Sequence, residues 1–190
     1  MNRDSIAKLY QSKQTIFTVI DLATIWNIGN NDTLKAKIHY LVRKSRIKRL
    51  HKGIFSLDAD YDKYELAGKL RSPSYVSLET VFRREGMVFQ YSEEITSVGS
   101  LRRSYTKNNI LYSYRKIKDS VLYNNKGIIQ QRNYAIAEKE RALLDIMYLN
   151  KEYYFDNLSK INWDKCRDIV KIYNNKKLEQ RLKKLIKKYA

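Results

Sequence analysis

The stretch TLKAKIHYLVRKSRIKRLHKGIFSL, Thr33 to Leu57, decides how the N-terminal part of this chain folds. Its first half carries apolar residues at positions i, i+4, i+7 and i+8, a spacing that predicts a helix with one buried stripe. These residues are Leu34, Ile38, Leu41 and Val42. Its second half changes to two short runs, Arg46–Leu50 and Ile54–Leu57, on either side of a tip that contains Gly53. A glycine between two such runs is typical of a β-hairpin.

The same stretch is strongly basic. It holds eight cationic residues and no carboxylate: Lys35, Lys37, Arg43, Lys44, Arg46, Lys48, Arg49 and Lys52. The whole chain of 190 residues has a net charge of +18, of which +8 falls within residues 1–57, +3 within 58–150 and +7 within 151–190. Such a balance favours polyanionic partners, either nucleic acid or an anionic membrane surface.

The residues before this stretch predict two further helices. A short helix is expected over Asp4–Tyr10, and Thr18 begins a second because a carboxylate follows it three residues later. A turn at Asn27–Asn30 leads to the third helix, which Asn31 or Asp32 is expected to cap. Two helices, a turn, a helix and a basic hairpin form the order of a winged helix-turn-helix. In that module the third helix enters the major groove of DNA.

This interpretation assigns the contacts with double-stranded DNA to two groups of residues. On the exposed side of the third helix, base edges are expected to meet Asn31, Thr33, Lys35, Lys37, Tyr40 and Lys44. At the hairpin, the phosphate backbone is expected to meet Lys48, His51 and Lys52. A solvated basic helix face would need no hairpin directly after it. The alternative that remains is a winged helix that makes only protein contacts.

The remainder of the chain predicts a second domain. The acidic run Asp58–Asp62 is interpreted as a linker, so the expected domains are residues 1–60 and 61–190. Ser77 is expected to cap a short helix. Tyr-rich or β-branched runs then predict a small antiparallel sheet. These runs are Ile95–Val98, Ser104–Thr106, Ile110–Tyr114 and Ile128–Gln131. The expected fold class is α+β: a winged helix-turn-helix followed by a mixed α/β domain with C-terminal helices.

Glu138–Leu149 predicts the core helix of the second domain, because it is apolar on most sides. Arg141 and Asp145 lie four residues apart in it and are expected to form an ion pair on its less apolar face, with a structural rather than catalytic role. The last predicted helix sets an apolar stripe against six lysines, which favours a docked helix with a solvated face. A second nucleic-acid contact and a partner surface are the alternatives.

Motifs for catalysis are missing. The six glycines are too scattered for a phosphate-binding loop, and no Asp/Glu-x-Lys of the restriction-nuclease type occurs. The single Cys166 excludes an internal disulfide and a cysteine-rich zinc site. We therefore expect no enzyme activity, no cofactor and no metal. The absence of a long apolar segment predicts a cytoplasmic protein without a membrane partner.

Three segments also carry a resemblance to a known family. They are LVRKSRIKRLHKGIFSL (Leu41–Leu57), ELAGKLRSPSYVSLETVFRREGM (Glu65–Met87) and AIAEKERALLDIMYL (Ala135–Leu149). In this order they resemble the helix and hairpin, the Pro-Ser-Tyr stretch and the Pro-Glu-Lys-Ala-Leu-Leu-Asp helix of the AbiEi-type antitoxins. That family belongs to the type IV, or abortive-infection, toxin–antitoxin systems of bacteria.

The resemblance implies a two-domain antitoxin that represses its own operon. Its winged helix would bind inverted repeats in promoter DNA, as a dimer, and its C-terminal domain would oppose a nucleotidyltransferase-like toxin. One alternative is a winged-helix transcriptional regulator whose second domain senses a ligand or dimerises. A structural DNA- or RNA-binding protein is another, and an enzyme is the least favoured.

Overall fold

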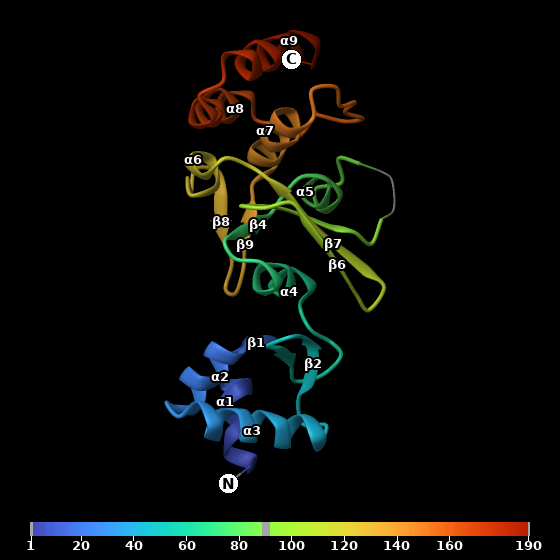
Figure 1. Cartoon of the computed structure of the whole chain (residues 1–190). Helices are drawn as coiled ribbons and strands as arrows, with labels where there is room; N and C mark the ends of the chain where they lie inside the picture. The colour runs from blue at the N-terminus through green and yellow to red at the C-terminus, as the bar shows by residue number, and fades with distance from the viewer. Residues whose placement is uncertain (1, 89–91, 190) are drawn as a thin grey trace. The chain divides into compact units, whose positions relative to one another are not determined.

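A computed structural model of the chain describes residues 2–88 and 92–189 and has an α+β fold (Figure 1). Its internal contacts divide the chain into two compact units, Met1–Leu70 (unit 1) and Arg71–Ala190 (unit 2). Within the described residues, no helix is both long enough and apolar enough to cross a membrane.

Unit 1 combines helices with a small antiparallel sheet of strand order β1-β3-β2. Its elements are α1 (Asn2–Gln11), β1 (Ile16–Thr18), α2 (Val19–Trp26), α3 (Asn31–Arg43), β2 (Lys48–His51), β3 (Ile54–Ser56) and α4 (Lys63–Leu70). The predicted third helix and hairpin are therefore present. Figure 1 shows α1, α2 and α3 grouped on one side of the sheet. The sequence interpretation missed β1, which pairs with β3 through Phe17 opposite Phe55.

The core of unit 1 lies between these helices and the sheet. As predicted, α3 buries Leu34, Ile38 and Leu41. The other buried members of the cluster are Leu9, Phe17, Leu22, Trp26, Ile47 and Phe55. Burying each large apolar side chain stabilises the fold by about 1.5–3 kcal/mol. The indole N–H of Trp26 donates to the carbonyl oxygen of Ser5 at 3.0 Å, so the buried ring keeps its hydrogen bond.

Capping interactions at both ends set the length of α2. Thr18 Oγ1 accepts the backbone N–H of Asp21 at 3.1 Å, and Asp21 Oδ2 accepts the backbone N–H of Thr18 at 2.8 Å. This reciprocal pair is the capping box that the sequence indicated. At the other end Asn27, with φ of 53°, takes the left-handed conformation, whereas Gly29 has no positive φ. Asparagine tolerates this geometry better than most residues.

Helix α4 belongs to unit 1. Glu65 Oε2 accepts the backbone N–H of Thr15 at 2.9 Å and its hydroxyl at 2.7 Å. Lys69 Nζ donates to Asp21 Oδ2 at 2.8 Å. Burial alone would raise the pKa of Asp21, but the hydrogen bonds from Lys69 and Thr18 outweigh it and lower the pKa. The contacts therefore separate the units after Leu70, later than the boundary expected at residues 60 and 61. The reason is that α4 is fastened to Thr15, just before β1, and to Asp21 of α2, both about fifty residues earlier.

Unit 2 is built on a mixed sheet of strand order β6-β7-β5-β4-β9-β8. Its strands are β4 (Ser74–Val76), β5 (Ile95–Gly99), β6 (Arg103–Lys107), β7 (Ile110–Lys116), β8 (Ile128–Gln130) and β9 (Ala135–Ala137). The prediction of a small antiparallel sheet is wrong in part, because β5 pairs with β7, and β4 with β9, in parallel. The runs predicted as strands coincide with β5, β6, β7 and β8. The strands β4 and β9 have only three residues each, too few for the alternation of apolar and polar residues that predicts a strand.

Unit 2 also contains helices. They are α5 (Glu79–Arg84), α6 (Asp119–Leu122), α7 (Lys139–Leu149), α8 (Trp163–Ile169), the 3-10 helix η1 (Val170–Tyr173) and α9 (Lys176–Tyr189). The predicted core helix is confirmed as α7, which packs against α5, β9, α8 and α9. Its Leu143, Leu144 and Ile146 are fully buried.

A buried charge pair lies in the core of unit 2. Arg141 Nε is 3.4 Å from Asp145 Oδ1, and both side chains are 0% exposed. Asp145 also accepts hydrogen bonds from the hydroxyls of Tyr173 at 2.6 Å, Ser77 at 2.8 Å and Tyr75 at 3.1 Å. Burial raises the pKa of Asp145, and Arg141 and these hydroxyls oppose that rise. The predicted ion pair is confirmed, although it is buried rather than on an exposed face. The expectation that Ser77 caps α5 is wrong, because its hydroxyl binds Asp145.

Candidate nucleic-acid interface

The start of α3 is fixed by Asn30. Its side-chain oxygen accepts the backbone N–H groups of Asp32 and Thr33, each at 2.9 Å. The expectation that Asn31 or Asp32 caps this helix is therefore wrong, since a capping oxygen reaches the second and third residues after its own. Asn31, Asp32 and Thr33 form the exposed first turn instead.

The outward stripe of α3 lies opposite its buried stripe. At about 100° per residue, Asp32, Ala36 and Arg43 lie opposite Leu34, Ile38 and Leu41, and His39 and Tyr40 lie about equally far from them on either side. All five are exposed. Of the other residues predicted from the sequence, Lys35 lies beyond His39, and Thr33 and Lys44 lie beyond Tyr40. Asn31, at the first position of the helix, falls nearer the direction of the buried stripe. The predicted set therefore surrounds the centre of the face but omits His39 and Arg43, which the helical period alone would have identified.

Lys37 stands apart from the other predicted residues. Its Nζ lies 4.5 Å from the centroid of the Trp26 ring, a cation–π contact within unit 1. The side chain is half-buried, and burial together with the nearby charge of Lys8 lowers its pKa. Lys37 therefore lies towards the other helices, at the margin of the outward stripe.

The hairpin is tied to the remainder of unit 1 at its tip. Gly53 has φ of 74°, which glycine adopts without strain, and its carbonyl oxygen accepts the N–H of Val19 at 3.1 Å. The register of β2 on β3 shifts between Arg49 and His51, so the strand carries a local irregularity before its tip. Exposed cations of the hairpin are Lys48, Arg49 and Lys52, and His51 is half-buried. The guanidinium carbon of Arg49 lies 5.5 Å from the Phe55 ring centroid.

Most cations on these two elements have no acidic partner. Among the described residues, no carboxylate lies within ion-pair distance of Arg43, Lys44, Arg46, Lys48, Arg49 or Lys52. Lys35 does pair with Asp32 at 3.5 Å, but both side chains are exposed, so the pair contributes little. Cations left uncompensated at the surface raise the local positive potential and attract polyanions.

Metal-binding groups and similarity to known proteins were the remaining possible indications of function. In residues 2–88 and 92–189, no group of three His, Cys, Asp or Glu side chains is arranged to hold a metal ion. Comparison with models of known protein families found no match for the chain, and comparison with curated proteins found none either. The geometry and charge of unit 1 therefore carry the functional argument.

Proposed function

We propose that unit 1 is a winged helix-turn-helix module that binds double-stranded DNA. The observation that carries this proposal is the run of unpaired, exposed cations from the end of α3 through the β2–β3 hairpin. The order of elements supports it, because a helix and a strand precede α2 and α3, and a hairpin follows them. A module used only for protein contacts would not need this concentration of uncompensated positive charge.

The two elements take different roles in this proposal. His39 and Arg43, together with Lys35 on the flank, lie where α3 would meet base edges in the major groove. Lys48 and Lys52 on the hairpin would contact phosphates, which position the protein without reading sequence. Sequence preference and salt dependence therefore belong to separate groups of residues.

We further propose that the whole chain is an antitoxin and autorepressor that opposes a nucleotidyltransferase-like toxin through unit 2. The support is the resemblance of three segments, which fall on α3 and the hairpin, on α4 to α5, and on β9 with α7. The second candidate is a transcriptional regulator with a ligand-binding unit 2, and a cavity in that unit favours it. Co-expression of this chain with a neighbouring nucleotidyltransferase gene distinguishes the antitoxin from the transcriptional regulator. Only an antitoxin restores growth to cells that the nucleotidyltransferase inhibits.

The DNA-binding proposal is tested by fluorescence anisotropy of the full chain on DNA from its own upstream region, over a range of salt concentrations. Lys52→Ala should weaken binding to all sequences alike and reduce the slope of log K against log salt by about 0.9, the value for one phosphate contact. Arg43→Ala should reduce the preference for the specific site, by about 1–3 kcal/mol for a bidentate base contact.

The matched control is Lys63→Ala. Lys63 is an exposed cation of α4, a helix outside the β2–β3 hairpin that packs against β1. It should change neither the affinity nor the salt slope. If Lys63→Ala weakens binding as much as Lys52→Ala, unit 1 attracts DNA only through its net charge, and the proposed interface is wrong.

A further inference from the structure

Unit 2 contains a cavity of about 580 Å³ beside strands β5, β7 and β6. It lies outside unit 1 and shares no residue with the proposed DNA interface. Cavities of roughly 300–1,000 Å³ are the usual size of small-molecule sites. Its lining is polar, with three arginines, two glutamates and several hydroxyl groups.

The register of the strands decides which of these side chains share the cavity. Thr96 on β5 lies opposite Ser113 on β7, which lies opposite Ser104 on β6, so three hydroxyl residues cross one face of the sheet in a row. Since side chains two residues apart point to the same face, Arg115 also belongs to this face. Extending the β6–β7 register by one residue sets Arg102 opposite Arg115.

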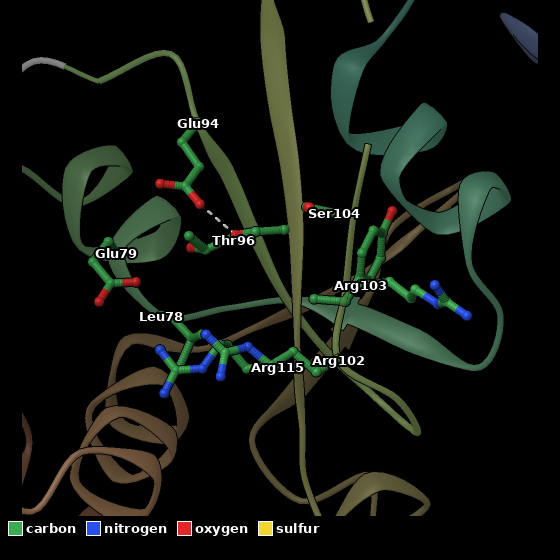
Figure 2. A pocket seen from close by; sticks show the side chains of 10 residues that line it. Leu78, Glu79, Glu94, Thr96, Arg102, Arg103, Ser104 and Arg115 are labelled. Carbon is green, nitrogen blue, oxygen red and sulfur yellow. Dashed lines mark hydrogen bonds between the residues drawn. The ribbon is translucent and has the colours of Figure 1, made fainter. Parts of the chain in front are cut away.

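Of the three arginines that line the cavity, Arg102 and Arg115 share one face of the sheet, and Arg103 lies on the alternate face. Figure 2 shows the side chains of Arg102 and Arg115 extending to the same side, towards Leu78, while Arg103 turns to the other side of the strand. Arg115 Nη2 donates to Asn150 Oδ1 at 3.1 Å, which holds this side chain in place. In the part of the chain that the structure describes, no carboxylate lies within ion-pair distance of Arg102 or Arg115. Two neighbouring arginine side chains thus line the cavity without forming an ion pair.

Carboxylates form a second polar group on the α5 side of the cavity. Glu79 begins α5, and Glu94 accepts a hydrogen bond from the hydroxyl of Ser113 (Figure 2). The wall between them is rigid, because Thr80 and Thr96 exchange backbone-to-hydroxyl hydrogen bonds of 3.0 and 2.7 Å. An occupant must therefore offer negative charge to the arginines and hydrogen-bond donors to the glutamates.

We infer that this cavity binds a small phosphorylated molecule that also carries hydroxyl groups, the chemistry shared by nucleotides and sugar phosphates. Arg102 and Arg115 bind the phosphate oxygens through charge-assisted hydrogen bonds, for which the planar guanidinium is well suited. Glu79 and Glu94 accept hydrogen bonds from the hydroxyl groups of the ligand. A ligand that carries only negative charge is disfavoured, because the two carboxylates repel it.

The test measures ligand binding to the full chain without DNA, by thermal shift and titration calorimetry, so its result is independent of the proposed DNA binding. The probes are adenosine monophosphate, ribose 5-phosphate, inorganic phosphate, adenosine and citrate. The two phosphate esters should bind more tightly than inorganic phosphate, and adenosine should not bind. Whichever ester binds more tightly shows whether the site prefers a nucleotide or a sugar phosphate. Tighter binding of citrate than of both esters, or no binding of either ester at millimolar concentration, would overturn the inference.

Neighbouring residues supply matched variants. Arg102→Ala should weaken binding of the preferred ester roughly ten- to a hundredfold, the effect of losing a hydrogen bond to a charged group. Arg103→Ala removes the same charge from a lining residue whose side chain turns to the other face, so it should weaken binding clearly less than Arg102→Ala. Glu79→Gln should weaken the ester but not inorganic phosphate. Since Arg102 is exposed, its loss should not prevent folding. Equal weakening by Arg102→Ala and Arg103→Ala would mean that only the general surface charge attracts anions.

Discussion

Replacing one member of the buried pair in α7 should destabilise unit 2 by an amount that depends on which member is removed. Asp145→Asn leaves the Arg141 charge buried, but that guanidinium keeps three backbone acceptors. They are the carbonyl oxygens of Val121 at 2.8 Å, Asn124 at 3.2 Å and Lys126 at 2.7 Å. Breaking a buried ion pair costs about 3–5 kcal/mol. Because Arg141 keeps these acceptors, we expect the destabilisation by Asp145→Asn to lie near the lower end of this range.

Arg141→Met should cost more. It leaves the charge of Asp145 in the core without its cationic partner, and it removes one donor from the carbonyl oxygens of Val121, Asn124 and Lys126. Val121 keeps the N–H of Asn124 as a donor, and the other two bonds are only partly buried, so these losses add little. We therefore expect a loss of about 5 kcal/mol, the upper end of the range for a broken buried ion pair, which is a large part of the stability of many domains. The double variant should cost less than the sum of the two single ones, because each removes part of the same network.

Urea unfolding of the full chain measures these losses, and hydrogen exchange assigns them to unit 2. Lys126→Met is the control, because its ion pair with Asp168 is exposed and should contribute less than about 1 kcal/mol. The reasoning would be refuted if Arg141→Met cost less than Asp145→Asn, or if both cost no more than the control.

Four further predictions follow from other contacts. A fragment of residues 1–70 should unfold cooperatively by circular dichroism, whereas residues 1–60, which lack the partners on α4, should not; equal stability of the two would contradict the placement of α4. Leu144→Ala should cost about 2–5 kcal/mol in urea unfolding, because the Leu144 side chain is fully buried. A loss below about 1 kcal/mol would mean that the neighbouring side chains move in and fill the space that the substitution leaves. The pKa of Asp21 is lower in the folded protein than the unfolded value of 3.8, so the ionised carboxylate stabilises unit 1 above pH 3.8, and this contribution is lost as the pH falls through the folded pKa. Asp21→Asn should therefore destabilise unit 1 at pH 6 and much less near pH 2. Burial raises the pKa of the Cys166 thiol from 9.0 to about 12, so a thiol reagent at pH 8 should label it only after unfolding, and prompt labelling of the native chain would show that the thiol is accessible.

Local patterns explain the part of the fold that could be predicted from the sequence. The stripe of Leu34, Ile38 and Leu41 predicted α3, and Gly53 predicted the hairpin turn. The capping box at Thr18 was also evident, since it joins residues three positions apart. Helix α7 could be predicted because apolar residues occupy most sides of it, from Ala142 to Leu149.

Long-range pairing explains what was missed. Glu65 reaches Thr15 across fifty positions, so no local pattern could attach α4 to unit 1. Parallel pairing of β4 with β9 is likewise invisible in either three-residue segment. The cavity of unit 2 depends on register: Arg102 and Arg103 are adjacent in the sequence, and only the alignment of β6 on β7 decides which one faces the ligand.

The parallel pairing of β4 with β9 also governs how unit 2 forms during synthesis. Val76 pairs with Ile136, which is translated 60 residues later. At roughly 5–20 residues per second, one edge of β4 stays without its neighbour for about 3–12 seconds after the strand is made. An unpaired edge can recruit strands from other chains. The corresponding wait in unit 1 is shorter, because Phe17 of β1 pairs with Phe55 of β3 only 38 residues later. Nascent unit 2 therefore keeps an unpaired strand edge for longer than unit 1 does, and needs more protection from aggregation.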